Sequence, residues 1–294
     1  MLAELGVRGP VALISAGWRH DELRDEPVRE SVGNEVQNVG IYAGFRLIER
    51  EAAELATLYA QKQSALRRVK ERYRAAIVPA LAACRELYAR THDVGCPWFR
   101  QAIVNFQRID QIFLEESDRL HYRFDAEVQP RRHPLVHAEM ERIRGVLEGT
   151  DAVLIAGGHV GVLRNRLAFF GMADLLADRR IVAWSAGAMA LADRVVLFHD
   201  HTTWGVGLAE VLDRGLGLMP GIVFLPHAQE RLALEQKENV LIFARRFAPA
   251  RCVGLQNGAV LRPGFLNVGQ HDAAFLLATD GSTPAIGEAD ASAP

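Results

Sequence analysis

A chain of 294 residues, 49% of them hydrophobic, is long enough to bury one large core or two smaller ones. The formal net charge of −2 disfavours binding to nucleic acid or to an acidic membrane surface, so neither partner is expected. The three cysteines, Cys84, Cys96 and Cys252, lie far apart and form no C-x-x-C pair, which favours reduced thiols and a cytoplasmic location. No signal peptide and no membrane-spanning segment are expected, because neither apolar pattern occurs.

The first predicted element is a buried strand over Pro10–Ala16, an apolar run that ends in small residues. The polar segment Gly17–Glu22 follows it. In open α/β sheets ligands bind at this C-terminal end of a strand, so Trp18, Arg19 and His20 are candidates for substrate contact. A solvated loop is the simpler interpretation of the same residues.

Residues 32–130 differ in character and predict an α-helical hairpin inserted into an α/β domain. Leu47–Arg90 is rich in strong helix formers, and its apolar residues recur at three- and four-residue steps. His92–Pro97 interrupts this pattern, and a second apolar stripe follows from Phe99 to Leu120. The stripes can pack on each other, on a second copy of the chain or over an active site as a lid. Core packing is the default, and a homodimer through the insertion is the alternative.

The residues after the insertion predict strands that alternate with helices. The strand Ala152–Ala156 runs through a tight turn at Gly157–His159 into a helix over 160–176. A second strand-turn-helix unit follows over 181–192. Two such units in succession indicate a parallel sheet with crossover helices. The sequence therefore predicts an α/β fold with a mostly parallel sheet flanked by helices.

The last third of the chain is expected to complete this sheet. The runs 251–255 and 259–262, separated by Gln-Asn-Gly, predict a strand pair with a tight turn. The other expected elements are a helix over 135–147, strands over 194–198 and 222–225, a Gly-rich loop over 202–219, a helix over 229–247 and closing strands over 265–279.

The chain is expected to divide into four parts. Residues 1–31 hold the first strand of the α/β domain, 32–130 form the helical insertion, and 131–279 form the remainder of a hydrolase-like α/β domain. Residues 280–294 are rich in Gly, Ser, Pro, Ala and acidic residues, and they predict a disordered tail.

The segment Arg180–Met189 predicts a short strand that turns sharply into a helix at Ser185. The small residues after Ser185 let the helix begin close against the strand, so that the hydroxyl stands clear of the backbone. The N–H of Ala186 then lies near the helix N-terminus, where donors are unpaired. This arrangement is that of a nucleophile elbow, although Ala183 replaces the first glycine of G-x-S-x-G. A serine that only caps the helix is the structural alternative.

A serine nucleophile needs a base that takes its proton and donors that bind the oxyanion. His227 lies in Phe-Leu-Pro-His at the C-terminal end of a predicted strand, the edge at which Ser185 is also expected. His227 is therefore the predicted base. Gly158, in the turn after the strand 152–156, can bring a second backbone N–H to the reacting carbonyl. A structural histidine and an ordinary Gly-Gly turn are the alternatives.

Four motifs occur in order along the chain: Ala156-Gly-Gly-His159, Trp184-Ser-Ala-Gly-Ala188, Gly215-Leu-Gly-Leu-Met-Pro-Gly221 and Pro226-His227. This set resembles the aspartyl dipeptidase and cyanophycinase family of serine peptidases, over about residues 135–275. The resemblance implies a class I glutamine amidotransferase-like fold. It also implies Ser185 as nucleophile, His227 as general base, and the amides of Gly158 and Ala186 as the oxyanion hole. Asp200, which is 200 − 185 = 15 residues past the serine, matches a family aspartate near the substrate.

Two positions depart from the family pattern. Asn257 stands where family members carry an acidic residue that orients the histidine. Asparagine can accept a hydrogen bond from imidazole but stabilises imidazolium less well, so Asp200 or Glu230 is the alternative for this role. The family's Gly-Gly-Gly-Asn turn is Ala-Gly-Gly-His here, which predicts that His159 faces the substrate pocket. The helical insertion is also not expected of the family.

The sequence thus predicts a serine hydrolase that cleaves a peptide-like amide bond, in a dipeptide or isopeptide, without metal or cofactor. Its predicted partner is a small peptide-like substrate. An alternative is a catalytically impaired family member that acts as an interaction protein through the helical hairpin, for which Asn257 is the main support.

A metal-dependent hydrolase is the third hypothesis. His199-Asp-His201 has a spacing that can bind zinc, and His227 or His159 could complete the site. Glutamine amidotransferase activity is not expected, because that chemistry uses a cysteine where this chain has Ser185. The G-G-H-V-G-V stretch falls short of the dinucleotide-binding pattern.

Overall fold

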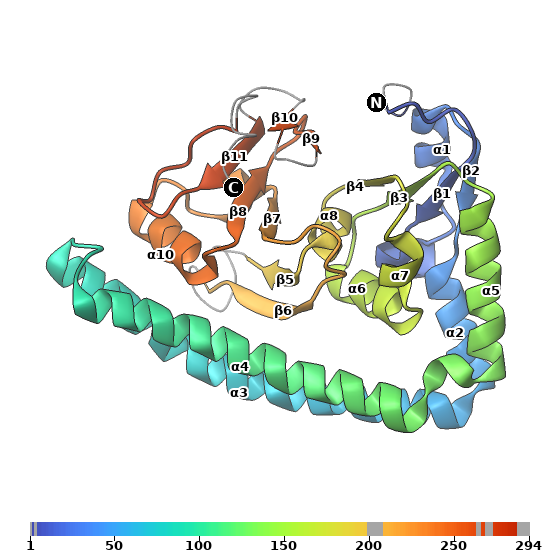
Figure 1. Cartoon of the computed structure of the whole chain (residues 1–294), viewed down its shortest axis with the longest axis horizontal. Helices are drawn as coiled ribbons and strands as arrows, with labels where there is room; N and C mark the ends of the chain where they lie inside the picture. Colours follow the sequence, from blue (N-terminus) through green and yellow to red (C-terminus); the bar gives the residue numbers. More distant parts are fainter. Residues whose placement is uncertain (1, 3–4, 199–207, 263–265, 268–272, 287–294) are drawn as a thin grey trace. The chain divides into compact units, whose positions relative to one another are not determined.

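The computed structural model describes residues 2, 5–198, 208–262, 266–267 and 273–286 (Figure 1). The chain forms two compact units, each built from segments far apart in the sequence. Unit 1 contains residues 1–65, 119–191 and 215–218, and unit 2 contains residues 66–118, 192–214 and 219–294. Two long helices, α3 (Ala53–Thr91) and α4 (Pro97–Val128), contribute residues to both units.

Unit 1 contains a four-stranded sheet in the order β2-β1-β3-β4, with every neighbouring pair parallel. The strands are β1 (Val11–Ile14), β2 (Val36–Asn38), β3 (Ala152–Ile155) and β4 (Ile181–Ala183). All residues of β1 and β3 are buried, because these two strands lie inside the sheet and carry only apolar side chains. The α/β class with a parallel sheet is confirmed. The expectation that the last third of the chain completes this same sheet is wrong, because Ile222–Pro226 and Arg251–Leu255 pair in a separate sheet.

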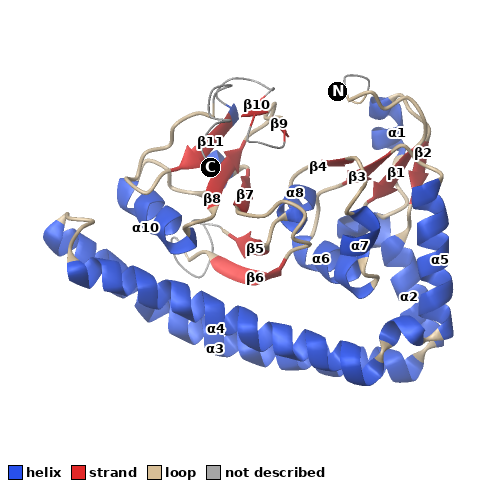
Figure 2. Cartoon of the chain, viewed as in Figure 1, coloured by secondary structure: helices blue, strands red, loops and turns tan. Residues whose placement is uncertain are grey.

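Helices and short 3-10 turns connect the strands of unit 1 (Figure 2). The helices are α1 (Glu26–Val32), α2 (Ile41–Glu51), α5 (Pro134–Glu148), α6 (Val160–Phe169), α7 (Met172–Leu176) and α8 (Ala186–Leu191). The 3-10 turns are η1 (Ala16–Asp21) and η2 (Pro130–Arg132). The single helix expected over 160–176 is wrong, because Gly171 takes a left-handed φ of 64° and separates α6 from α7.

The helical insertion begins later than the predicted boundary at residue 32. β2 pairs with β1 in the sheet, and α2 buries Ile41, Phe45 and Ile48 in unit 1. Ala52 has a non-helical conformation and separates α2 from α3, so the long helix expected from residue 47 is two helices. Short strands such as β2 carry too few residues for their alternation to stand out in the sequence.

The helical hairpin of α3 and α4 is confirmed, and its aromatic residues pack on each other. Within unit 2, the rings of Tyr73 and Phe113 stack with centroids 4.3 Å apart. Within unit 1, Tyr59 of α3 contacts Phe124 of α4 edge-on, with centroids 5.9 Å apart. These contacts support the default prediction that the two apolar stripes face each other. No described helix combines the length and apolarity that a membrane crossing requires.

Unit 2 contains a three-stranded sheet in the order β11-β8-β7. Its strands are β7 (Ile222–Pro226), β8 (Arg251–Leu255) and β11 (Ala274–Leu277). β8 runs parallel to β7 and antiparallel to β11, so the hairpin expected over 251–262 is wrong. The ring of Phe275 occupies the space where a side chain on Gly254 would lie, which fixes β11 against β8. The next strand, β9 (Leu261–Arg262), pairs instead with β10 (Leu266–Asn267).

Two further predictions in this region are wrong in detail. The Gly-rich segment expected as a loop contains β6 (Glu210–Arg214), which pairs antiparallel with β5 (Arg194–Leu197). The helix expected over 229–247 is two helices, α9 (Ala228–Arg231) and α10 (Lys237–Phe247). Leu232 has an extended conformation and ends α9.

The predicted disordered tail is also wrong for its first residues. Residues 280–286 fold back on β11, where Leu276 N donates to Pro284 O at 2.9 Å and Ile286 N donates to Ala274 O at 2.8 Å. Ile286 is fully buried. The rest of the predicted tail lies outside the described residues.

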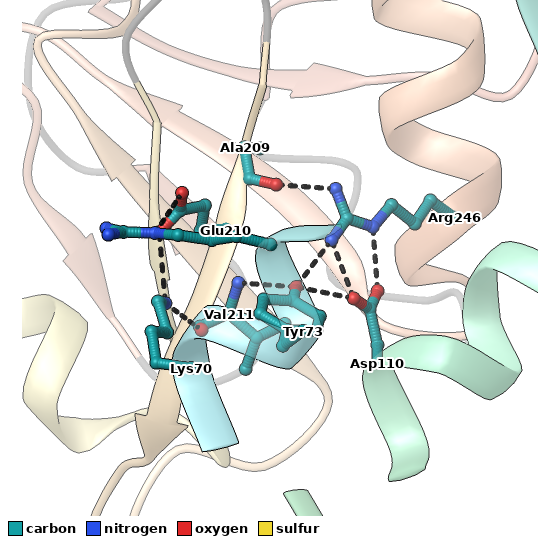
Figure 3. A network of polar contacts seen from close by, with 8 residues as sticks. Lys70, Tyr73, Asp110, Ala209, Glu210, Val211 and Arg246 are labelled. Carbon is teal, nitrogen blue, oxygen red and sulfur yellow. Dashed lines mark hydrogen bonds and ion pairs between the residues drawn. The ribbon is translucent and has the colours of Figure 1, made fainter. Parts of the chain in front are cut away.

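A buried polar network joins the hairpin to α10 within unit 2 (Figure 3). Arg246 of α10 donates to both oxygens of Asp110 on α4, at 2.7 and 2.6 Å, and to Tyr73 Oη on α3 at 2.9 Å. Tyr73 Oη in turn donates to Asp110 at 2.7 Å. Burial acts to lower the pKa of Arg246, but its contacts with Tyr73 and Asp110 outweigh burial and raise it.

The same network also forms hydrogen bonds with backbone groups of β6 and of Ala209, the residue before it (Figure 3). Arg246 donates to Ala209 O at 2.7 Å, Val211 N donates to Tyr73 Oη at 3.0 Å, and Lys70 Nζ donates to Val211 O at 2.6 Å. An exposed strand edge invites pairing with another chain. Side chains of the hairpin and of α10 therefore take the place that a further strand would occupy.

Candidate active site

Ser185 lies between β4 and α8 and is half-buried. Its φ of 52° is left-handed, which is uncommon for a residue with a side chain. The chain closes tightly around it, because Gly187 N donates to Trp184 O at 2.9 Å and Met189 N donates to Ser185 O at 3.2 Å. The strand, sharp turn and helix that the sequence predicts at this serine are therefore present.

Two glycines let this turn pack against the end of β3. A Cβ on Gly187 would lie 2.2 Å from Ile155 O, closer than any side chain can approach. A Cβ on Gly157 would lie 2.8 Å from Ser185 Cβ and 3.1 Å from its Oγ. Gly157 is therefore a direct neighbour of the Ser185 hydroxyl, and this close approach is possible because Gly157 has no side chain.

The two amides predicted for the oxyanion hole are free to act as donors. Neither Gly158 N nor Ala186 N donates a hydrogen bond to any described residue. Gly158 has a φ of 107°, and a Cβ there would lie 2.6 Å from Gly17 O, so only glycine fits. Ala186 N is 3.5 Å from the Cβ position of Gly157. Both amides thus border the glycine that contacts Ser185.

His159 caps helix α6, a role that the sequence analysis missed. Its Nδ1 accepts a hydrogen bond from Val162 N at 3.2 Å, so the proton of the neutral ring is on Nε2. Its backbone N donates to Gly17 O at 2.8 Å. The residue is exposed, and Nε2–H has no hydrogen-bond partner among the described residues. The position directly before a predicted helix favours a side chain that caps it, which is the signal that could have revealed the role.

The segment after β1 lies against the same glycine turn. Trp18 Cδ1 is 3.1 Å from the Cβ position of Gly158, and η1 packs against α6. Arg19 has a φ of 64° and a ψ of −119°, a strained conformation for a residue with a long side chain. It is exposed and has no ion-pair partner among the described residues. His20 packs edge-on against Tyr42, with ring centroids 5.5 Å apart.

A buried glutamate fixes this segment, and the sequence analysis did not find it. The Glu22 carboxylate accepts from Tyr42 N and Ala43 N, both at 2.8 Å, at the start of α2. Burial raises the pKa of Glu22, although these two hydrogen bonds act to lower it. Ser15 Oγ and Asn38 Nδ2 both donate to Glu22 O at 2.8 Å. The polar residues that follow β1 are thus held by contacts that no local pattern reveals.

His227 lies in unit 2, directly after β7, and is half-buried. Its φ of 60° is also left-handed, so it shares with Ser185 a backbone conformation found at five non-glycine positions among the described residues. Its backbone N donates to Leu255 O at 2.8 Å. Strained backbone conformations of this kind are concentrated at functional sites in proteins. Ser185 belongs to unit 1 and follows β4 of the four-stranded sheet, whereas His227 follows β7 of the three-stranded sheet. The expectation that both residues lie at the edge of one sheet is therefore wrong.

Asn257 is exposed in the turn that follows β8. β8 pairs with β7 so that Leu255 lies beside Pro226, and the turn therefore starts at the same sheet edge as His227. Gln256, one residue earlier, reaches back to this edge, and with its amide turned so that the oxygen faces α9 it accepts from Gln229 N at 2.9 Å and from Ala228 N at 3.2 Å. No local sequence pattern indicates this contact, which caps α9 next to the histidine.

The other candidates for orienting His227 are Glu230 and Asp200. Glu230 is exposed on α9. Asp200 lies outside the described residues, as do His199 and His201 of the zinc hypothesis. Among the residues that the structure describes, no group of three His, Cys, Asp or Glu side chains could hold a metal ion.

Comparison of the sequence with models of known protein families gave no match, and neither did a search among curated proteins. The functional roles considered below therefore rest on the residues of this chain and on their geometry.

Proposed function

We propose that the protein is a serine hydrolase that cleaves a peptide-like amide bond, with Ser185 as nucleophile and His227 as general base. The observation that carries this proposal is the strained turn at Ser185, which has a φ of 52° and packs its hydroxyl against Gly157. A serine that served only as a helix cap would need neither this strain nor the two free amides of Gly158 and Ala186 beside it. A class I glutamine amidotransferase-like fold is part of the same proposal.

In the proposed reaction, Ser185 Oγ attacks the carbonyl carbon of the scissile amide while His227 takes the hydroxyl proton. The amides of Gly158 and Ala186 donate to the oxyanion of the tetrahedral intermediate. His227 then gives its proton to the leaving amine as the C–N bond breaks, and an acyl-Ser185 remains. A water molecule, deprotonated by the same imidazole, hydrolyses this ester and restores the enzyme.

The residue that orients His227 in this scheme is Asn257, with Asp200 and Glu230 as alternatives. His159 and Asp200 are proposed to contact the substrate. The Nε2–H of His159 supports its role, because the cap on α6 holds Nδ1 and leaves this donor without a partner among the described residues. An asparagine in place of a carboxylate stabilises imidazolium less well, so the proposed enzyme is expected to be slow.

A fluorophosphonate probe tests the proposal, since it phosphonylates activated serine hydroxyls. We expect intact-mass analysis to show one adduct on the wild-type protein and none on Ser185→Ala. Ser31→Ala is the matched control, because Ser31 is exposed on α1 and its hydroxyl donates to Pro27 O at 2.6 Å. Persistent labelling of Ser185→Ala, or loss of labelling in Ser31→Ala alone, would contradict the proposal.

A second candidate function is an interaction surface on the helical hairpin. Trp98 and Tyr122 of α4 are 73% and 77% exposed, and Val104 and Ile112 of the same helix are also exposed. Exposed aromatic residues are enriched at protein interfaces. A homodimer through this helix is the arrangement to test, by measuring the mass in solution of the wild type and of Trp98→Ala across a range of concentrations. A monomer at every concentration would argue against it.

A further inference from the structure

A pocket lies within unit 2, beside the buried polar network and separate from Ser185 and His227. It has a volume of about 440 Å³ not occupied by protein atoms, part of it open to solvent. Its walls come from α3, α4, α10, the segment that follows α9, and β11. Most of these walls are apolar, and they include Leu81, Phe106, Val240 and Phe243.

Two arginines reach this pocket, and their environments differ. Arg246 is 4% exposed and is neutralised by Asp110, with further hydrogen bonds to Tyr73 and Ala209. Arg85 of α3 is half-buried, and no carboxylate among the described residues lies within ion-pair distance of it. Among the described residues, the pocket thus contains one guanidinium that pairs with a carboxylate, Arg246, and one that does not, Arg85.

The single polar side-chain partner of Arg85 among the described residues is neutral. Arg85 Nη2 donates to Asn239 Oδ1 at 2.9 Å, and Asn239 Nδ2 donates to Gln236 Oε1 at 2.6 Å. These bonds fix the orientation of the Asn239 amide and hold the guanidinium at the pocket wall. A partly buried cation without a counter-ion costs free energy, which an anion at the same place recovers. The neighbouring Glu86 does not supply that anion, because it is exposed and pairs with Arg90 at 2.6 Å.

We propose that this pocket binds a short aliphatic carboxylate, with the carboxylate on Arg85 and the hydrocarbon chain between Leu81, Phe106 and Phe243. Ligand pockets in proteins are mostly apolar and carry a few polar groups that orient the ligand, which is the composition found here. A volume of about 440 Å³, partly open to solvent, is at the small end of the range for ligand pockets, so the ligand must be short. This inference does not depend on hydrolase activity at Ser185.

Calorimetric titration of the full chain with hexanoate tests the proposal. We expect saturable binding with a dissociation constant on the order of 1 mM or lower, the affinity that a few apolar atoms and one charged hydrogen bond supply. Acetate lacks the chain and hexanol lacks the charge, so each should bind at least about tenfold more weakly than hexanoate.

Two variants address the two halves of the pocket. Arg85→Gln removes the charge and should weaken hexanoate binding about tenfold or more. Leu81→Trp fills the apolar space and should abolish binding, and since Leu81 is only half-buried the helix can carry the larger ring. Arg90→Gln is the matched control on the same helix and should bind as the wild type does. Circular dichroism of each variant establishes that it is folded, and if one variant fails to fold, the other decides.

Three results would overturn the inference. Wild-type protein that does not bind hexanoate has no such site. Equal binding by the wild type, Arg85→Gln and Leu81→Trp would mean that hexanoate binds elsewhere on the chain. Equal affinity for hexanol and hexanoate would show that the Arg85 guanidinium does not recognise a carboxylate.

Discussion

Asp110→Asn should destabilise unit 2 strongly, because it removes the counter-ion of a buried arginine. Asp110 is 1% exposed, and its oxygens accept two hydrogen bonds from Arg246 and one from Tyr73. The substituted amide presents N–H groups where the guanidinium also presents N–H groups, so at least one of these bonds is lost and two donors face each other. Among the described residues Asp110 is the one carboxylate that pairs with Arg246, which is only 4% exposed, so the charge is left without a counter-ion there.

Breaking a buried ion pair by removing one partner costs about 3–5 kcal/mol of unfolding free energy. Asparagine keeps one acceptor oxygen, so the lower end of this range, about 3 kcal/mol, is expected for Asp110→Asn. Urea unfolding followed by circular dichroism measures it as a shift of the midpoint at an unchanged slope.

Asp118→Asn is the matched control for this experiment. Asp118 lies on the same helix and pairs with Arg214 at 3.0 Å, but both side chains are more than one-third exposed. Exposed pairs of this kind contribute at most about 1 kcal/mol, so this variant should be only slightly destabilised. If Asp110→Asn costs no more than Asp118→Asn, the network in Figure 3 does not hold the hairpin on unit 2.

Three further outcomes follow from the structure. Gly187→Ala should lower stability by about 1–3 kcal/mol and abolish fluorophosphonate labelling, because its Cβ would lie 2.2 Å from Ile155 O; a labelled, stable variant would contradict the tight turn. Burial raises the pKa of Glu22, so the contribution of Glu22 to folding stability is complete below its unfolded pKa of 4.5 and is lost as the pH rises through its folded pKa. Glu22→Gln should therefore flatten this part of the curve of unfolding free energy against pH, and an unchanged curve would refute the assignment. Cys96 alone should react rapidly with a thiol reagent at neutral pH, because burial raises the pKa of Cys84 to about 11 and that of Cys252 to about 12; rapid reaction of three thiols would contradict this.

Strands β1 and β3 of unit 1 could be predicted because their signals are local, whereas the short strand β2 could not. β1 and β3 are continuous apolar runs with small residues or glycines after them, and such runs are buried in parallel sheets. The long helices α3 and α4 were predictable for the same reason, since their apolar periodicity extends over many turns. The turn at Ser185 was also predictable, because the run of small residues after it allows few other packings.

The pairing of strands in unit 2 could not be read from the sequence. Gln-Asn-Gly after β8 has the residues of a tight hairpin turn, but β8 finds its partners in β7 and β11, which are distant along the chain. β6 was missed because glycines surround it and because its outer edge is satisfied by side chains of α3 and α10. Such long-range contacts leave no local pattern.

Positioning residues of the candidate site were missed for a related reason. Glu22 and Gln256 act by capping helices that begin elsewhere in the chain or across a turn, so their spacing to the capped amides follows no fixed motif. His159 caps its own helix and could have been recognised, because the residue before a helix is a preferred position for a side-chain acceptor. The role of Asp200 stays a prediction, since it lies outside the described residues.

The rate of fluorophosphonate labelling in His227→Ala tests most directly whether an imidazole activates the Ser185 hydroxyl. Removal of a general base typically slows such a reaction by about a hundredfold or more, and that loss is expected here at neutral pH. His137→Ala, a change at an exposed histidine of α5, should label at the wild-type rate. Labelling of His227→Ala as fast as that of the wild type would contradict the proposed nucleophile–base pair.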